Sequence, residues 1–201
     1  MIEPALPGPR DPDQLIRDLT SGRDRLAQAA VERLKDQRVA HFPELVSLLD
    51  SPDPDQRWWA VRALAETRLP NRTALYQRAL EDQAPAVVQC ALLALRAEPA
   101  PEAVAGLIPL LSRRDSLTAR LAGEAVLAVG ERAVPELLMV LRGGSGRGRS
   151  EAARTLALLE DPRAVPLLVH LLDADSALVT YWAEEGLARL GVGMVFFKPG
   201  E

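Results

Sequence analysis

A repeat of about 31 residues runs through most of this 201-residue sequence and restricts its fold more than any other feature. Two series of residues carry the repeat. The first consists of leucines that, by subtraction of their numbers, follow one another after 31, 31, 30 and 31 residues: Leu49, Leu80, Leu111, Leu141 and Leu172. The second consists of alanines that keep the same step: Ala60, Ala91, Ala122, Ala152 and Ala183. A fixed period of this length is typical of proteins that stack copies of one small unit.

Each unit is predicted to contain two helices. Apolar residues recur three or four positions apart, as at Leu45, Leu48 and Leu49, and this is helical spacing. Turn-forming segments such as 143–146 separate the helices, and Pro109 should kink or shorten the helix that contains it. One helix pair cannot bury its own apolar stripe, so the pairs must stack. We therefore expect an all-α, right-handed α-solenoid, or α-α superhelix, of about six helix pairs.

The same period divides the chain into three parts. We expect an extended or disordered segment over residues 1–11 and a solenoid over residues 12–191. A tail over residues 192–201 is predicted either to cover the end of the last repeat or to dock elsewhere. The predicted repeats cover approximately residues 12–39, 40–69, 70–99, 100–130, 131–160 and 161–191.

Charge and cysteine content narrow the class of protein. The net charge of -4 and the pI of about 5.4 favour a protein partner over nucleic acid. Cys90 is the only cysteine, which excludes an internal disulfide. The first residues lack the basic start and apolar run of a signal peptide, and no segment has the length of a membrane span. We expect a cytoplasmic protein without membrane insertion.

Two segments resemble known repeats. Residues 161–168 read Asp-Pro-Arg-Ala-Val-Pro-Leu-Leu and precede Leu171 and Leu172, while Gln56 and Arg57 lead into the segment 60–64, Ala-Val-Arg-Ala-Leu. These are similar to the first and second helices of bacterial HEAT repeats, of the subtype that is also found in phycobilin lyases. The resemblance covers residues 12 to 191 and implies a HEAT-like solenoid whose second helices line a concave face. It implies little about function, because such repeats serve many purposes.

The second helices offer a candidate binding face. Ala60 and Leu64 are predicted to face the core, which displaces Trp58, Trp59 and Arg62 toward the exposed side of the same helix. We expect one of the two tryptophans to be buried. Aromatic and arginine side chains are common anchors of interfaces. Aligning the repeats gives the full set of predicted partner-binding residues: Trp58, Trp59, Arg62, Arg120, Glu124, Arg154, Tyr181, Trp182 and Glu185.

A second candidate site is basic. Arg142, Arg147 and Arg149 lie on one glycine-rich turn, and Arg113 and Arg114 lie on the equivalent turn of the preceding repeat. Successive turns of a solenoid lie side by side, so the five arginines could form a basic ledge that binds phosphate or an acidic partner. The alternative is a solvated mixture of these charges with the acidic residues of neighbouring turns.

The sequence offers little for catalysis. The candidate metal ligands His41, His170 and Cys90 fall in different repeats, so neither a metal nor a cofactor is expected. The glycine-rich turn also lacks the ending of a phosphate-binding loop. Two functions stay open. The favoured one is a non-catalytic bacterial scaffold or adaptor that binds another protein on the concave face. The alternative is a HEAT-like enzyme, either a phycobilin-type chromophore lyase or a DNA-repair glycosylase, that uses the same groove.

Overall fold

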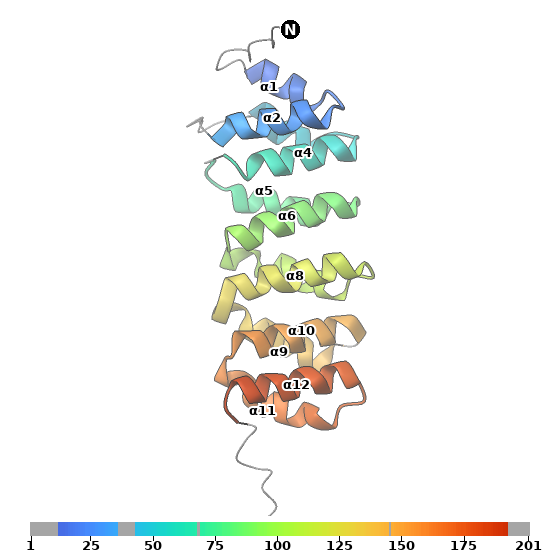
Figure 1. Cartoon of the computed structure of the whole chain (residues 1–201), viewed down its shortest axis with the longest axis vertical. Helices are drawn as coiled ribbons and strands as arrows, with labels where there is room; N and C mark the ends of the chain where they lie inside the picture. The colour runs from blue at the N-terminus through green and yellow to red at the C-terminus, as the bar shows by residue number, and fades with distance from the viewer. Residues whose placement is uncertain (1–11, 36–42, 68, 145, 193–201) are drawn as a thin grey trace, which may run out of the picture. The chain divides into compact units, whose positions relative to one another are not determined.

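The computed structural model describes residues 12–35, 43–67, 69–144 and 146–192, and these form helices joined by short turns (Figure 1). No strand occurs within these ranges. The predicted all-α fold of paired helices is therefore confirmed. The segment predicted over residues 1–11, His41, and the tail predicted over residues 192–201, except Val192, lie outside the described residues.

The chain divides into two compact units, Met1–Arg72 and Thr73–Glu201. The helices of unit 1 are α1 (Pro12–Leu19), α2 (Asp24–Lys35), α3 (Pro43–Ser47), the short 3-10 turn η1 (Leu48–Asp50) and α4 (Pro54–Leu64). Helix α1 packs on α2, and α4 packs on both α2 and α3. Leu19, Val31, Leu34 and Leu45 are buried between these helices.

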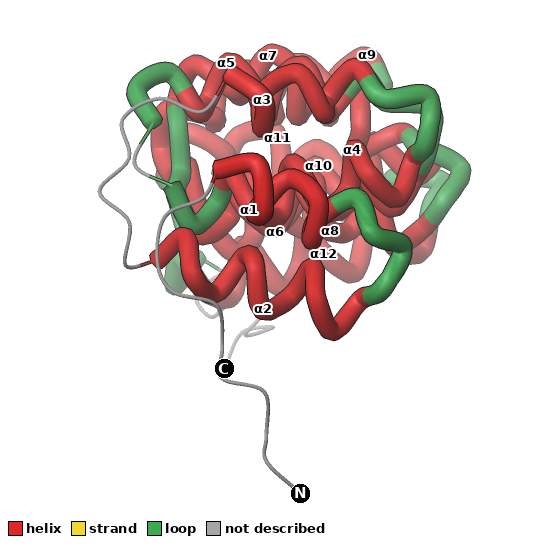
Figure 2. The backbone as a smooth tube through the Cα atoms, turned by 90° about the horizontal axis from the view of Figure 1, so that it is seen from above, coloured by secondary structure: helices red, strands yellow, loops and turns green. Residues whose placement is uncertain are grey.

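Unit 2 contains four helix pairs in the residues described. Its helices are α5 (Arg72–Leu80), α6 (Pro85–Ala97), α7 (Val104–Leu107), α8 (Ser116–Val129), α9 (Val134–Gly143), α10 (Gly146–Leu159), α11 (Val165–His170) and α12 (Ala177–Arg189). Short 3-10 turns extend the first helices α7, α9 and α11, namely η2 (Pro101–Ala103), η3 (Ile108–Ser112), η4 (Gly130–Ala133), η5 (Pro162–Ala164) and η6 (Leu171–Asp173). In Figure 2, α5, α7 and α9 lie in one layer, and α6, α8 and α12 lie in the other.

The second helices of unit 2 pack directly on one another, α6 on α8, α8 on α10 and α10 on α12, as Figure 1 shows. Small residues permit this close approach. A Cβ atom added to Gly186 of α12 would lie only 3.1 Å from the Cα atom of Ala157 of α10. The alanines of the predicted series, including Ala91, Ala122 and Ala183, are fully buried. The alanine repeat therefore marks the contact between neighbouring second helices.

Proline shortens the first helix α7. Helix α7 ends at Leu107, and the 3-10 turn η3 continues through Pro109. Proline has no amide hydrogen to donate to the preceding turn, and its ring clashes with that turn. The prediction that Pro109 kinks or shortens its helix is confirmed. Leu111 and Leu141, from the leucine series, are nevertheless completely buried, so the short first helices still close the core.

Candidate functional site

The exposed side of the second helices in unit 2 carries a row of polar and aromatic side chains, which we call the second-helix face. It is formed by Gln89 and Arg96 of α6, Arg120 and Glu124 of α8, Glu151 of α10, and Tyr181, Trp182, Glu185 and Arg189 of α12. The helical period places these residues opposite the buried alanines. Each of them is at least partly accessible.

Glu124 joins two neighbouring second helices. Its carboxylate accepts a hydrogen bond of 2.6 Å from Arg96 Nη1 of α6 and one of 3.4 Å from Arg120 Nε of its own helix. Burial by itself raises the pKa of Glu124, but the hydrogen bonds and charges of Arg96 and Arg120 together lower this pKa below its usual value. Glu124 therefore stays ionised at neutral pH, which suits a binding or structural role and not that of a proton donor.

Asp115 makes a second link between α6 and α8. It is the N-cap of α8, where it accepts hydrogen bonds from the backbone amides of Leu117 and Thr118 and from the Thr118 hydroxyl. Gln89 Nε2 of α6 donates a further bond of 2.9 Å. The Thr118 hydroxyl is the largest influence on this carboxylate, and the bonds together lower the pKa of Asp115. Hydrogen bonds from both Gln89 and Arg96 thus fix α6 against α8.

Arg154 does not lie where the sequence placed it. It was predicted to contact a partner, but its side chain is only 3% exposed. Its Nε donates a hydrogen bond of 2.8 Å to Glu151. The reason is Gly123 of α8, where an added Cβ atom would lie 2.7 Å from Arg154 Nη2. The missing side chain leaves a notch that the guanidinium fills, and Nη2 is buried there without a hydrogen-bond partner among the described residues. The prediction for Arg154 was wrong.

Helix α12 carries the aromatic part of the face. The rings of Tyr181 and Trp182 meet edge to face, with centroids 5.1 Å apart and planes at 74°. Tyr181 is 53% exposed and Leu178, one turn earlier, is 54% exposed. Glu185 accepts a bond of 2.7 Å from Arg189 Nε, which raises the pKa of Arg189. An accessible apolar and aromatic surface therefore lies beside a fixed ion pair, a combination that is common in binding sites.

The other aromatic pair lies in unit 1. Trp58 and Trp59 of α4 meet edge to face, with centroids 4.7 Å apart and planes at 87°. Both are half-buried, so the prediction that one of them is buried was wrong. The core positions of α4 are occupied by Ala60 and Leu64, which were predicted correctly. Arg62 forms an ion pair of 2.7 Å with Glu66.

The arginines of the predicted basic ledge lie on two turns of unit 2. Arg113, Arg114, Arg142 and Arg147 are exposed. Arg149 is half-buried, and its Nε donates a hydrogen bond of 3.2 Å to the carbonyl oxygen of Leu141. Four of the five arginines are thus accessible to a partner, while the fifth ties α10 to the end of α9.

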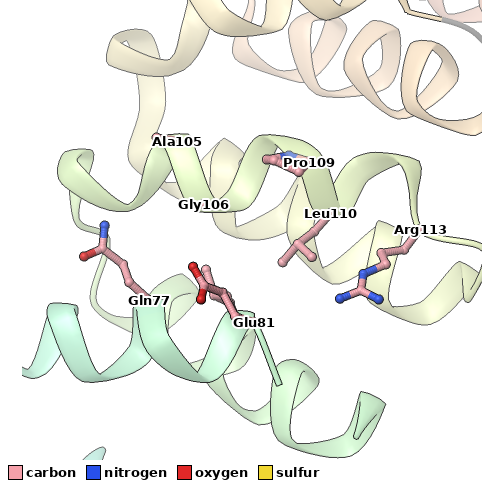
Figure 3. Close-up of a pocket in the computed structure, with 8 residues that line it drawn as sticks. Gln77, Glu81, Ala105, Gly106, Pro109, Leu110 and Arg113 are labelled. Carbon is pink, nitrogen blue, oxygen red and sulfur yellow. The ribbon is translucent and has the colours of Figure 1, made fainter. Parts of the chain in front are cut away.

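A groove on the first-helix side of unit 2 was not predicted from the sequence. It has a volume of about 730 Å³ and lies between α5 and the α7–η3 segment (Figure 3). Leu80, Pro109 and Leu110 form its apolar part, and Glu81 and Arg113 are among its polar side chains. Gly106 opens this groove, since an added Cβ atom would lie 3.3 Å from Leu80 Cδ1.

Sequence reasoning missed Arg96 and Arg189 of the second-helix face, and it missed the exposed Leu178 one turn before Tyr181. Leu178 carried an available signal, because it precedes Tyr181 by three residues and Trp182 by four, the spacing of one helical face. The sequence gives no signal for Arg96, since its partner Glu124 is 28 residues away along the chain.

Two general properties concern the described residues only. No three histidine, cysteine, aspartate or glutamate side chains cluster there as metal ligands would, and Cys90 is buried. None of the helices described is both long and apolar enough to cross a membrane.

The chain belongs to the HEAT-repeat family, because the family profile for HEAT repeats matches residues 42–128 and 105–188. The resemblance to HEAT repeats that the sequence suggested is therefore confirmed. It extends to the phycobilin-lyase subtype through the bilin biosynthesis protein RpcF of Synechococcus sp. (strain WH8020). The two proteins are 36% identical over 92 residues, which is 45% of this chain and 44% of RpcF. The match thus spans less than half the length of this relative.

Solved structures share the fold. A chain in the complex of CpcE and CpcF of phycocyanin lyase from Nostoc sp. PCC7120 superposes with a TM-score of 0.52 at 24% identity, covering 96% of this chain and 82% of that one. An engineered protein superposes with a TM-score of 0.50 at 21% identity, covering 92% of this chain and 98% of that one. At this level of identity, the similarity establishes the fold alone.

Proposed function

We propose that this HEAT-repeat protein is a chromophore-lyase type of subunit that binds a bilin on the second-helix face of unit 2 and acts together with a second protein chain. The observation that carries the proposal is the 36% identity to a bilin biosynthesis protein over 92 residues. The shared fold with a chain of the CpcE and CpcF complex is consistent with a protein partner. The comparisons add no support for a DNA-repair glycosylase.

The second-helix face has the chemistry that a bilin requires. A bilin is a linear tetrapyrrole, with a flat conjugated system and carboxylate side chains. Tyr181 and Trp182 offer accessible ring surface for the conjugated system. The Arg96 and Arg120 side chains stay 47% and 52% exposed even though both touch Glu124, so their free N–H groups can bind a carboxylate.

The charges on this face favour binding over acid–base chemistry by this chain itself. A general acid needs a pKa near the working pH. Arg96 and Arg120 lower the pKa of Glu124, which moves this pKa further from neutral pH. We therefore expect this subunit to hold and orient its ligand, with any proton transfer supplied by the second chain.

A second candidate function is a protein-binding adaptor without chemistry of its own. It is favoured by exposed apolar side chains that lie one helical turn before Arg96 and Arg120 on the second helices. Leu93 of α6 is 43% exposed and Leu117 of α8 is 52% exposed. Apolar residues within a polar surround are typical of protein interfaces.

A bilin titration distinguishes the two functions. Purified protein is titrated with free phycocyanobilin while the visible absorbance of the pigment and the tryptophan fluorescence of the protein are followed. We expect saturable binding that weakens at least about tenfold in the variant Tyr181→Ala, Trp182→Ala, because two aromatic contacts are lost. The matched control is Met139→Ala on α9, a first-helix residue that is 62% exposed and should bind like wild type.

Each outcome has a clear meaning. Circular dichroism shows whether the double variant is folded, and Tyr181→Ala alone serves if Trp182 is needed for folding. Absence of saturable bilin binding by wild type would remove the lyase proposal and leave the adaptor. Equal loss in the Met139→Ala control would show that the second-helix face is not the site.

A further inference from the structure

The two arginine-bearing turns of unit 2 are in direct contact. Gly148 in the first turn of α10 abuts Ser112 at the end of η3, since an added Cβ atom at Gly148 would overlap the Ser112 hydroxyl. Ser112 precedes Arg113 and Arg114, and Gly148 follows Arg147. The hydrogen bond from Arg149 to Leu141 brings the end of α9, and so Arg142, to the same place.

The four exposed arginines of these turns keep their charge available. Arg113, Arg114, Arg142 and Arg147 form no ion pair with any residue that the structure describes. Arg96, Arg120, Arg154 and Arg189 of the second helices differ in this respect, since all four are paired with glutamate. Helix α10 also has no acidic residue in its first turn, so its N-terminal dipole adds to the positive potential.

Acidic residues limit this positive patch on both sides along unit 2. The preceding turn, between α5 and α6, carries Glu81, which is exposed and lines the same groove as Arg113 (Figure 3). The following turn, between α11 and α12, carries the exposed Asp173 and Asp175. A long polyanion such as nucleic acid presents phosphates continuously and would meet these carboxylates. The patch is therefore suited to a short anionic group.

We propose that the four exposed arginines of the basic ledge, Arg113, Arg114, Arg142 and Arg147, dock a short acidic segment of a partner protein. Guanidinium groups bind carboxylates through paired N–H groups, and several on adjacent turns can hold successive acidic side chains. The flanking acids Glu81, Asp173 and Asp175 disfavour a longer acidic stretch and so select for length. The site lies on the turns that precede α8 and α10, shares no residue with the second-helix face and does not depend on bilin binding.

The test is fluorescence anisotropy with a labelled peptide that contains a run of four glutamates. We expect wild type to bind the peptide at about 10 mM salt, where charges act over roughly 30 Å, and to bind it more weakly at about 0.15 M salt. The variant R113Q/R114Q/R142Q/R147Q should lose at least about tenfold in affinity. The control R23Q/R25Q/R78Q/R132Q removes four other exposed arginines with the same change in net charge and should stay within about twofold of wild type.

Competition experiments identify the ligand. Unlabelled inorganic phosphate and a single-stranded oligonucleotide of equal charge are each added against the peptide. Both should compete more weakly than the unlabelled peptide. Phosphate that competes equally well would replace the proposal with a small-anion site, and a stronger oligonucleotide would replace it with nucleic-acid binding. No peptide binding at low salt, or an equal loss in the control variant, would overturn it.

Discussion

The two helix layers of unit 2 have the same repeat period but differ in regularity. The second helices α6, α8, α10 and α12 contain 13 or 14 residues, whereas α5, α7, α9 and α11 contain between 4 and 10. The second helices pack directly on one another. The first helices α7, α9 and α11 are extended by 3-10 turns, and three of these turns contain a proline, at Pro101, Pro109 and Pro162.

This difference separates two roles within one repeat. The regular layer carries the polar links between neighbouring pairs, at Asp115 and Glu124, and it presents the exposed aromatic side chains of α12. The interrupted layer buries leucines such as Leu111 and closes the core. Only the second helices therefore form a continuous face, and we place the function on this second-helix face.

The largest expected effect is on the free energy of unfolding, when one glycine of each layer is replaced by alanine. In Gly186→Ala, the new methyl group would lie 3.1 Å from the backbone of Ala157 in the second layer, which cannot move easily. We expect a loss of about 1–2 kcal/mol in the free energy of unfolding. In Gly106→Ala, the new group meets only the end of the Leu80 side chain, so the gain in helix propensity should stabilise by up to about 1 kcal/mol. Urea unfolding measures the free energy of unfolding of both variants. Equal changes in the two variants would contradict the proposed difference in packing between the layers.

A smaller effect concerns the cap that links α6 and α8. Hydrogen bonds lower the pKa of Asp115 in the folded state, led by that from Thr118. The resulting stability is therefore complete above the unfolded pKa of about 3.9 and is lost as the pH falls through the lower folded pKa. Asp115→Asn should be less stable than wild type near neutral pH, and the difference between them should shrink as the pH falls below about 4. Urea unfolding over this pH range provides the test, and a difference that persists in acid would mean that the ionised carboxylate is not responsible.

The sequence predicted the fold more completely than the site. The alanine and leucine periods are sufficient for the helix pairs, because burial in a repeat protein follows the period directly. The prediction failed at Arg154 and at the tryptophan pair. In both cases the burial of the side chain depends on a neighbouring residue. This neighbour is Gly123 for Arg154 and the adjoining ring for each tryptophan. A repeat alignment does not contain this information. The repeat boundaries themselves stay predictions.

The smallest effect is expected at the ion pair between Arg96 and Glu124. The pair joins two second helices, but its side chains are 47% and 28% exposed, so water weakens the attraction. A double-mutant cycle with Arg96→Ala and Glu124→Ala should give a coupling energy of about 0.2–1 kcal/mol that falls in about 1 M salt. A larger, salt-independent coupling would indicate that the second layer depends on this pair more than on its packed alanines.

Hydrogen exchange with and without saturating phycocyanobilin tests most directly the claim that the second-helix face of unit 2 is the functional surface. The backbone amides of α12, and those of α10 on which it packs, should become more protected when the pigment is added, while those of α7 and α9 should not change. Protection that appears in the first helices instead, or no change anywhere at saturating pigment, would contradict the account.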